Sequence, residues 1–292
     1  MWARVNAPVL NEVYMMMKCK LCGHSNAHKH GTLPNGTQRY RCLRCQKTFT
    51  ESFDTLYYRR HVTPEQIRLV LQCHAEGSSL RGVARTTGLT YNTVVSLVRS
   101  TSHKAQQVHN VGVSDVETDG VSADELWSFV KKKQKHCLPA ELEVGDCWIA
   151  MSLDRRSGLI LSARVNKHTD RLLSELITST EGKTSCKDWS TDDWGGYERI
   201  LPSEYDHYIG KDKTQRLERT NGIVRQQTGR WHRRQNEFGK LWEQTKVSTR
   251  LIVSYFNWIW KHSRLHTTAA QRAGLTVGAW DWHDLASFPT LI

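Results

Sequence analysis

The segment "CWIAMSLDRRSGLILSARV" (residues 147–165) decides the fold, because its two halves have the pattern of an antiparallel hairpin. Two apolar runs, residues 147–153 and 159–165, flank the polar stretch "DRRSG", which carries residues that turns favour. Asp154 begins that stretch, where a hairpin turn favours an aspartate, so we interpret it as a structural residue. The sequence therefore predicts two paired strands joined by a short turn.

The segments on either side of this hairpin extend the pattern. A first strand is expected at "GVSADELWSFV" (residues 120–130), followed by a long link, "QKHCLPAELEVGD". After the hairpin, helical spacing begins at Asp170, and short strands are expected at "KDWSTDDW" (187–194) and "DHYIG" (206–210), before a closing helix. A three-strand meander followed by a helix, a strand and a closing helix predicts a ribonuclease-H-like α/β domain.

Acidic residues fall at informative points of this topology. Asp124 on the first strand and Asp192 after the fourth would lie side by side, with the helix that carries Glu218 crossing beside them. Three such carboxylates can bind two Mg²⁺ ions roughly 4 Å apart, and ligation by oxygen alone disfavours zinc. Two alternatives remain open. Glu125 neighbours Asp124 but should point to the opposite face of the strand, and Asp193 competes with Asp192 as the second ligand.

The helix "RLERTNGIVRQQ" (residues 216–227) contains one acid, Glu218, among arginines. Residues seven apart differ by roughly 20° around a helix, so Glu218 and Arg225 share a face, with Asn221 between them. A surface Glu–Arg ion pair is the simpler interpretation, but it leaves the alignment with the two aspartates unexplained. We favour a metal ligand, with Arg225 reaching the scissile or an adjacent phosphate.

Four of the eight cysteines form two pairs, "CKLC" and "CLRC", with 19 residues between them. This spacing is typical of a zinc site with four thiolates, and the intervening Pro-Asn-Gly turn indicates the hairpin that brings the pairs together. Disulfides are the alternative, and they are disfavoured in the cytosol. Because four sulfurs leave no open position, we expect one structural Zn²⁺, bound by Cys19, Cys22, Cys42 and Cys45.

The segment that follows has the layout of a helix-turn-helix. Thr63 is expected to cap a first helix that begins at Pro64, and Gly88 marks the turn within "SLRGVARTTGLTYNTVVSLVR" (residues 79–99). A helical hairpin used only for packing is the alternative. Side chains expected to read base edges are Tyr91, Asn92, Thr93 and Ser96, and those expected to contact phosphates are Arg81, Arg85 and Arg99.

The charge distribution fits a polyanionic partner. Of the 292 residues, 1–110 carry 15 Lys and Arg against 5 Asp and Glu, residues 111–210 carry 12 against 18, and residues 211–292 carry 14 against 6. Basic ends around an acidic centre indicate nucleic acid at both ends and cations between. The stretch "RWHRR" is expected to contact DNA backbone through Arg230, Arg233 and Arg234.

Membrane insertion and secretion are not expected. The longest apolar run, "LIVSYFNWIW" from Leu251, has ten residues, half the length of a membrane span, and predicts a buried helix. Aromatic residues in and before this run are interpreted as core. The first residues lack the pattern of a signal peptide, so a cytoplasmic location is expected.

These motifs, in order, resemble the insertion-sequence-one family of bacterial transposases. The resemblance covers roughly residues 17–265 and rests on the cysteine module, the helix-turn-helix, "ADELWSFVKKK", "STDDWGGY" and "QRLERTNGIVRQ". Many members of that family join two reading frames by frameshifting, whereas this chain carries both halves continuously. Two departures stand out: "TDDW" replaces the usual "TDGW", which keeps Asp193 open, and the 25-residue gap between Asp192 and Glu218 is one longer than expected.

The resemblance implies roles for named residues. It matches Asp124, Asp192 and Glu218 to the family's catalytic triad, Asn221 to its asparagine at plus three and Arg225 to its basic residue at plus seven. It also implies a ribonuclease-H-like fold, Mg²⁺ (or Mn²⁺) as a two-ion cofactor, and the element's terminal inverted repeats as substrate.

We therefore expect a DNA transposase that binds double-stranded DNA, cleaves it to free a 3′-OH and transfers that strand to target DNA. It should act in the bacterial nucleoid as a homodimer or larger assembly, because two DNA ends must be joined. The alternatives are a catalytically inactive DNA-binding regulator and a ribonuclease-H-like nuclease. The expected domains are a zinc ribbon (1–60), a helix-turn-helix (61–110), the catalytic domain (111–265) and a C-terminal extension (266–292).

Overall fold

The computed structural model describes residues 17–210, 212–231 and 238–289. The chain divides into two compact units, a smaller one that ends at Arg60 and a larger one, His61–Phe288. None of the helices in the described residues is long and apolar enough to cross a membrane. The domain boundaries expected above stay a prediction, and the helix-turn-helix and catalytic segments fall together in the larger unit.

The smaller unit is a three-stranded antiparallel sheet in the order β1-β2-β3. Its strands are β1 (Ala27–Thr32), β2 (Gln38–Cys42) and β3 (Thr48–Thr50). Gly36, with a φ of 81°, turns the chain between β1 and β2. Tyr40 stacks on Phe49 with ring centroids 5.9 Å apart, and both rings are buried. The predicted hairpin between the cysteine pairs is confirmed.

The larger unit begins with three helices, α1 (Pro64–Ala75), α2 (Leu80–Thr87) and α3 (Tyr91–Gly112). Thr63 caps α1 as predicted, and its side chain accepts the backbone N–H of Gln66. Gly88 ends α2 in the left-handed conformation with a φ of 69°. Helices α2 and α3 contact each other, and Val83, Val94 and Val98 on them are fully buried. The predicted helix-turn-helix layout is therefore confirmed.

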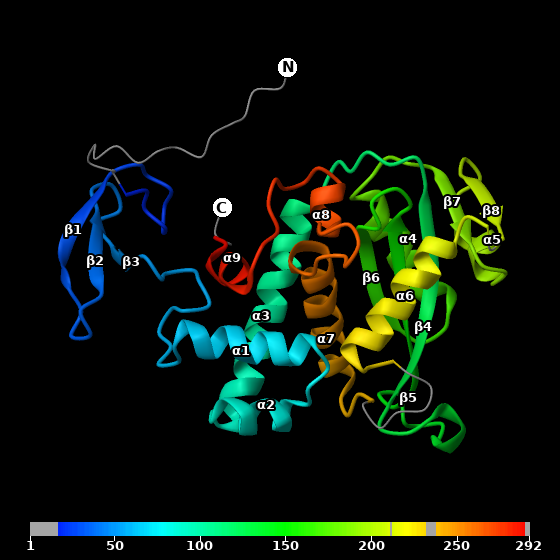
Figure 1. Cartoon of the computed structure of the whole chain (residues 1–292), viewed down its shortest axis with the longest axis horizontal. Coiled ribbons are helices and arrows are strands. Elements are labelled where there is room, and N and C mark those ends of the chain that lie inside the picture. Colours follow the sequence, from blue (N-terminus) through cyan, green and yellow to red (C-terminus); the bar gives the residue numbers. More distant parts are fainter. Residues whose placement is uncertain (1–16, 211, 232–237, 290–292) are drawn as a thin grey trace. The chain divides into compact units, whose positions relative to one another are not determined.

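A five-stranded sheet follows, in the order β6-β5-β4-β7-β8 (Figure 1). Strands β4, β5 and β6 form an antiparallel meander, while β7 and β8 run parallel to β4. This strand order is that of the ribonuclease-H-like fold, so the predicted fold class is confirmed. The bounds of the strands, and of the short 3-10 helix in the link, are β4 (Val121–Val130), η1 (Gln134–His136), β5 (Gly145–Asp154), β6 (Ile160–Asn166), β7 (Asp188–Thr191) and β8 (Asp206–Ile209).

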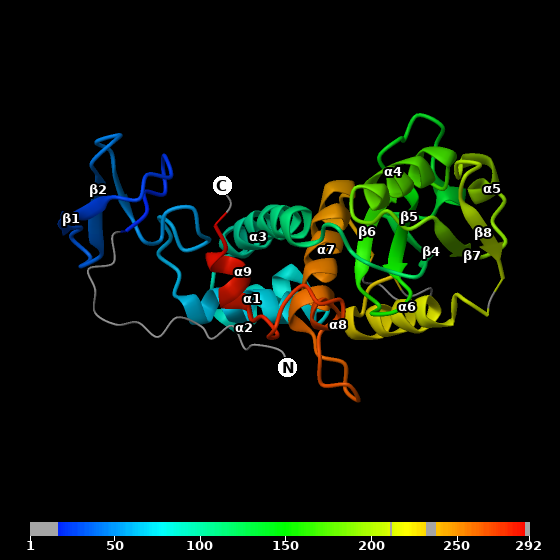
Figure 2. The same cartoon turned by 90° about the horizontal axis from the view of Figure 1, so that it is seen from above.

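Helices cover both faces of this sheet, and Figure 2 shows α4 and α6 on opposite sides of the strands. Leu217 and Val224 of α6 pack with Leu126 of β4 and Phe256 in one buried cluster. The apolar run from Leu251 is buried, as predicted, at the end of α7 and in the π-helical turn after it. The helices around the sheet are α4 (Asp170–Glu181), α5 (Gly196–Ile200), α6 (Gln215–Thr228), α7 (Trp242–Ser254) and η2 (Tyr255–Ile259).

The last residues return to the first helices. The helices α8 (Ala269–Arg272) and α9 (Trp282–Ser287) close the chain. Trp282 stacks on Tyr255 with centroids 5.5 Å apart, and its ring N–H donates to the side chain of Gln72 at 2.7 Å. The segment expected to be an extension therefore contributes to the core of the larger unit.

Helix α3 joins the helical part to the sheet. Its second half packs against α7, and the Nε2–H of His109 donates to the carbonyl of Leu161 on β6 at 2.9 Å. Burial lowers the pKa of His109 to about 4, and the positive charges of Lys183 and Arg164 act in the same direction. The folded protein thus keeps this imidazole neutral at pH values where an unfolded chain takes up a proton.

We predict that His109→Gln weakens the acid sensitivity of folding. Because the pKa of His109 falls from 6.5 to about 4 on folding, its neutral form favours the folded state above pH 6.5. That contribution, about 3 kcal/mol at most, is lost as the pH falls from 6.5 towards 4. Urea unfolding between pH 7 and pH 4.5 measures it. The control is His103→Gln, at an exposed position on the same helix. Equal pH slopes for the two variants would contradict the prediction.

Candidate active site

Two aspartates from distant parts of the chain meet where a parallel ladder ends. Strand β7 pairs with β4 through three residues, and the last pair is Ala123 with Thr191. The next residues, Asp124 and Asp192, therefore emerge side by side. The carboxylates of Asp124, Glu125 and Asp192 offer oxygens that all lie within 4.8 Å of one another. The structure thus brings together the first two members of the predicted triad.

Glu125 corrects one expectation. Its side chain was expected to point away from the site, yet its carboxylate belongs to the cluster. It is buried, and the hydroxyl of Tyr197 on α5 donates a hydrogen bond to it. The reason lies at the edge of the sheet: beyond Ala123, strand β4 no longer pairs with β7. Side chains from both faces of β4 can therefore turn towards the same open edge.

Two carboxyls of the cluster, those of Asp124 and Glu125, have raised pKa values. Burial raises the pKa of Asp124, and the charge of Asp192 adds to the effect. Burial also raises the pKa of Glu125 to about 8, with the charges of Asp124 and Asp192 acting in the same direction against the hydroxyl of Tyr197. Like charges this close are stabilised by a bound cation or a proton. Since all donors are carboxylate oxygens, the cluster fits a hard divalent ion such as Mg²⁺.

Helix α6 presents Asn221 and Arg225 to this cluster. Asn221 is fully buried, and its Nδ2 donates to Oδ2 of Asp124 at 2.7 Å. Its own carbonyl oxygen is buried with no hydrogen-bond partner among the described residues. The positive charge of Arg225 lowers the pKa of Asp124, against the raising effect of burial. Two residues of the predicted face of α6, Asn221 and Arg225, therefore act on Asp124.

Glu218 does not join them. It lies in the first turn of α6, exposed to solvent, and its carboxylate is outside the group of oxygens within 4.8 Å. The predicted triad is thus only partly assembled, and Glu125 is the third carboxylate of the observed cluster. Glu218 is displaced from Asn221 by about 60° around the helix, which explains why one of the two residues is buried and the other exposed.

The other aspartates considered as ligands, Asp192, Asp193 and Asp154, differ in their contacts. Asp192 accepts the backbone N–H of Trp194 at 3.2 Å, whereas its neighbour Asp193 is exposed and outside the cluster. Asp154 is fully buried at the hairpin turn and accepts the backbone N–H groups of Arg156 and Ser157 at 2.9 and 3.0 Å. These contacts confirm that Asp154 is a structural turn residue.

One element beside the site has no motif in the sequence. His168, in the loop between β6 and α4, is stacked between two tryptophans, with ring centroids 4.1 Å from Trp148 and 3.7 Å from Trp194. Burial lowers the pKa of His168, and the charge of Asp192 opposes that shift. The ring of Trp194 thus packs on a histidine beside the second aspartate. The sequence signal for this stack is the position of Trp194, two residues after Asp192.

The four predicted zinc ligands converge in the smaller unit. All four sulfurs lie within 4.8 Å of one another, with Cys19 and Cys45 at 3.8 Å and Cys22 and Cys42 at 3.6 Å. A tetrahedral ion with Zn–S bonds of 2.3 Å places its sulfurs about 3.8 Å apart. Backbone N–H groups of Arg44 and Cys45 also point at the sulfur of Cys42. The donor set therefore fits Zn²⁺.

The predicted DNA contacts have different environments. The base-reading residues Tyr91, Asn92 and Ser96 are exposed, and Thr93 is half-buried beside the cap Thr90. The exposed phosphate-contact candidates are Arg81, Arg85 and Arg99. The guanidinium of Arg230 instead donates to the carbonyls of His74 and Ser78 at 2.8 and 3.1 Å, which indicates a structural role. Arg233 and Arg234 lie outside the described residues.

Comparisons with known proteins locate similarity in the catalytic segment. A family model described as IS1 transposase matches residues 120–258. No curated protein sequence matches the chain.

Similar solved structures include a pre-cleavage Mos1 transpososome, with 9% sequence identity, 66% of this chain and 79% of that chain covered, and a TM-score of 0.24. A Mos1 paired-end complex with left transposon end has 9% identity, the same coverage and a TM-score of 0.23. The Mos1 strand transfer complex has 9% identity, covers 66% and 78%, and has a TM-score of 0.19. The fold assignment rests on the strand order and not on these structures.

The match to the family model begins just before β4 and ends within η2. It therefore includes both aspartates at the end of the β4–β7 ladder and the whole of α6. The segment that builds the carboxylate site is therefore the segment that is similar to the IS1 transposase family.

Proposed function

We propose that the chain is a DNA transposase that binds the terminal inverted repeats of an insertion sequence and catalyses metal-dependent strand cleavage and strand transfer. The observation that carries this proposal is the pairing of Asp124 with Asp192, with the amide of Asn221 hydrogen-bonded to Asp124. The match of residues 120–258 to the IS1 transposase family model supports it, as do the helix-turn-helix and the four-cysteine cluster.

Asp124, Asp192 and Glu218 would hold the divalent cations, Mg²⁺ or Mn²⁺. When bound, such ions activate an attacking oxygen and stabilise a leaving 3′ oxygen at a phosphodiester. We assign the third position to Glu218, because the resemblance described above matches this residue to the family's catalytic glutamate, whereas Glu125 accepts a hydrogen bond from the hydroxyl of Tyr197. Glu218 is exposed at the start of α6, so its long side chain has room to turn towards the cluster.

The other residues position these groups. The hydrogen bond from Asn221 fixes the orientation of the Asp124 carboxylate, and the positive charge of Arg225 is placed to attract a phosphate. In the first reaction, water attacks a phosphorus at the element end, the P–O bond to the 3′ oxygen breaks, and a 3′-OH is released. In the second, that hydroxyl attacks a phosphorus of target DNA, forming one P–O bond as another breaks.

The recognition half supplies affinity for double-stranded DNA. Arg81, Arg85 and Arg99 would contact phosphates, while the exposed first turn of α3 would read base edges in the major groove. The smaller unit, held by Zn²⁺, would add positive charge along the duplex. Joining two ends requires two recognition halves, so we propose a homodimer or larger assembly on DNA, in the bacterial nucleoid.

The carboxylates can be tested with a strand-transfer assay on DNA that carries the element's own ends, in Mg²⁺. Asp124→Asn and Asp192→Asn should lower the rate by about 10²–10³-fold, as expected when a group that stabilises transition-state charge is lost. Glu218→Gln should act equally strongly, and Asn221→Ala should cost about 10–100-fold, because it only orients a ligand. Asp193→Asn is the matched control and should stay near wild type.

Several outcomes would redirect the proposal. Full activity of Glu218→Gln, with loss in Glu125→Gln, would move the third position to Glu125. Specific binding of the ends without cleavage by the wild-type protein would favour an inactive regulator. Cleavage without joining would favour a ribonuclease-H-like nuclease.

The zinc site can be tested by metal analysis of the purified chain. We expect one equivalent of Zn²⁺ per chain, with loss of that metal and of duplex binding in Cys42→Ser, because the remaining three sulfurs cannot complete a closed site. Cys73→Ser is the control, since Cys73 lies outside the cluster. A metal-free protein that still binds duplex DNA like wild type would contradict this prediction.

A further inference from the structure

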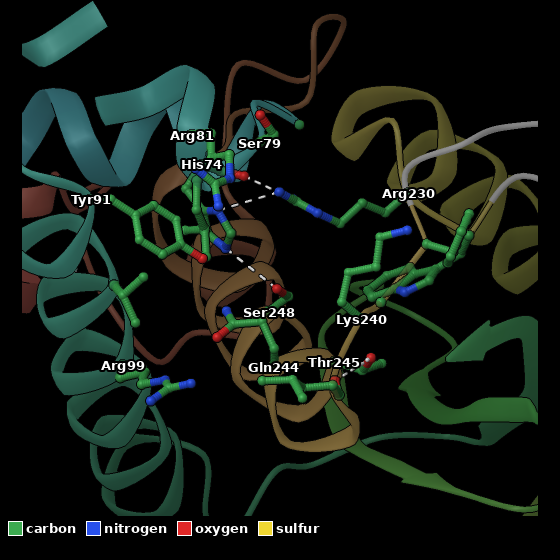
Figure 3. A pocket seen from close by; sticks show the side chains of 17 residues that line it. His74, Ser79, Arg81, Tyr91, Arg99, Arg230, Lys240, Gln244, Thr245 and Ser248 are labelled. Carbon is green, nitrogen blue, oxygen red and sulfur yellow. Dashed lines mark hydrogen bonds between the residues drawn. The ribbon is translucent and has the colours of Figure 1, made fainter. Parts of the chain in front are cut away.

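A pocket of about 380 Å³ lies between the helix-turn-helix and the residues just before and at the start of α7 (Figure 3). Arg81, Tyr91 and Arg99 line it from α2 and α3, and Phe238 and Lys240 line it from the opposite side. Both sides belong to the larger unit. The volume is within the range of about 300–1,000 Å³ that is typical of pockets for small organic molecules, so a nucleotide fits.

The walls of this pocket are basic and aromatic. Among the described residues that line it, none is an Asp or a Glu. The guanidinium carbon of Arg81 lies 5.0 Å from the ring centroid of Tyr91, and the ammonium of Lys240 lies 3.8 Å from that of Phe238. In the described part of the chain, no carboxylate forms an ion pair with Arg81, Arg99 or Lys240. Their positive charge is therefore available to an anion.

This combination matches one ligand chemistry closely. Cations beside exposed aromatic rings are the elements with which proteins bind single-stranded nucleic acid, since the cations attract phosphates and the rings stack on bases. Tyr91 retains 42% of its surface exposed, enough for a base to reach its ring. A site that binds only the phosphates of duplex DNA would need the cations but not the aromatic rings, because paired bases are not available for stacking on side chains.

The pocket also lies on the path from the recognition helix to the carboxylates. Helix α6 runs from Asn221, at Asp124, to Thr228, whose carbonyl lies against Gly77 in the pocket wall. These seven residues span about 10 Å of helix, the rise of about three nucleotides in one strand of a duplex. Gly239, in the opposite wall, bridges to Val130 at the end of β4, the strand that carries Asp124.

We propose that this pocket seats an unpaired nucleotide of the DNA strand that leads to the reacting phosphodiester. Its base stacks on Tyr91, and its phosphates lie between Arg99 on one side and Lys240 on the other. The inference rests on the proposed function, since it places the nucleotide on the strand that the carboxylates cleave. It adds single-strand capture to a helix-turn-helix that would otherwise read only duplex DNA.

The test compares binding of fluorescently labelled dT12 and of a 12-base-pair duplex to the full chain, by anisotropy without divalent ions. Tyr91→Ala should weaken dT12 binding about 5- to 100-fold, the effect of one lost base stack, and Tyr91→Phe should retain it. Lys240→Glu should weaken dT12 binding and lower its salt slope by about 0.7. Arg85→Glu makes the same charge change on α2 outside the pocket, so it should weaken duplex binding and spare dT12 binding.

Three results would overturn the proposal. The first is an unchanged affinity for dT12 in both Tyr91→Ala and Lys240→Glu. The second is a loss of dT12 affinity in Tyr91→Phe equal to that in Tyr91→Ala. The third is an equal loss of dT12 affinity in Arg85→Glu and Lys240→Glu. Circular dichroism and melting temperature verify that each variant is folded. The proposed function fails separately: if wild type transfers no strand but the dT12 pattern holds, the pocket stands and the transposase assignment falls.

Discussion

The short parallel ladder between β4 and β7 is the constraint on which the site depends. It has three residue pairs, and its β7 residues Trp189, Ser190 and Thr191 are all buried. Arg155 holds the start of β7 through Asp188 at 2.6 Å and Ser190 at 2.7 Å. Because side chains alternate along a strand, a slip of one residue in this register would carry Asp192 away from Asp124. The chemistry therefore depends on how β7 is packed and paired, as well as on the clustered carboxylates themselves.

The carboxylate site also contains a buried hydrogen-bond acceptor without a partner among the described residues, which costs free energy of folding. The carboxylate of Asp124 can only accept, so the amide of Asn221 must turn its nitrogen towards it. The other end of that amide is then a buried acceptor without a partner among the described residues, a state that costs about 1–3 kcal/mol. Violations of this kind in an otherwise well-packed core are typical of functional sites. The orphaned oxygen supports the interpretation that α6 is shaped for chemistry and not only for burial.

Sequence alone could predict the order of the elements, because each has a strong local signal. The hairpin at Asp154, the cap at Thr63 and the turn at Gly88 depend on neighbouring residues, and all three are confirmed. The third carboxylate is different. Whether Glu125 or Glu218 approaches the aspartates depends on where β7 stops and on how α6 is rotated over the sheet, and neither is encoded locally. The stack of His168 between Trp148 and Trp194 likewise joins three separate segments, so periodicity could not reveal it.

Helix α3 gives the two halves a common frame. It runs without interruption for 22 residues, about 33 Å, from Tyr91 in the pocket wall to the region of His109 at β6. It packs on α7, and residues 238–241, just before α7 in the chain, line the pocket. A continuous helix contains no joint, so the orientation of its first turn relative to the sheet is set by this packing. DNA held at Tyr91 would therefore have a defined position relative to Asp124. A longer linker between recognition and catalysis would leave that position free, and the pocket between the two halves would then have no fixed shape to offer a nucleotide.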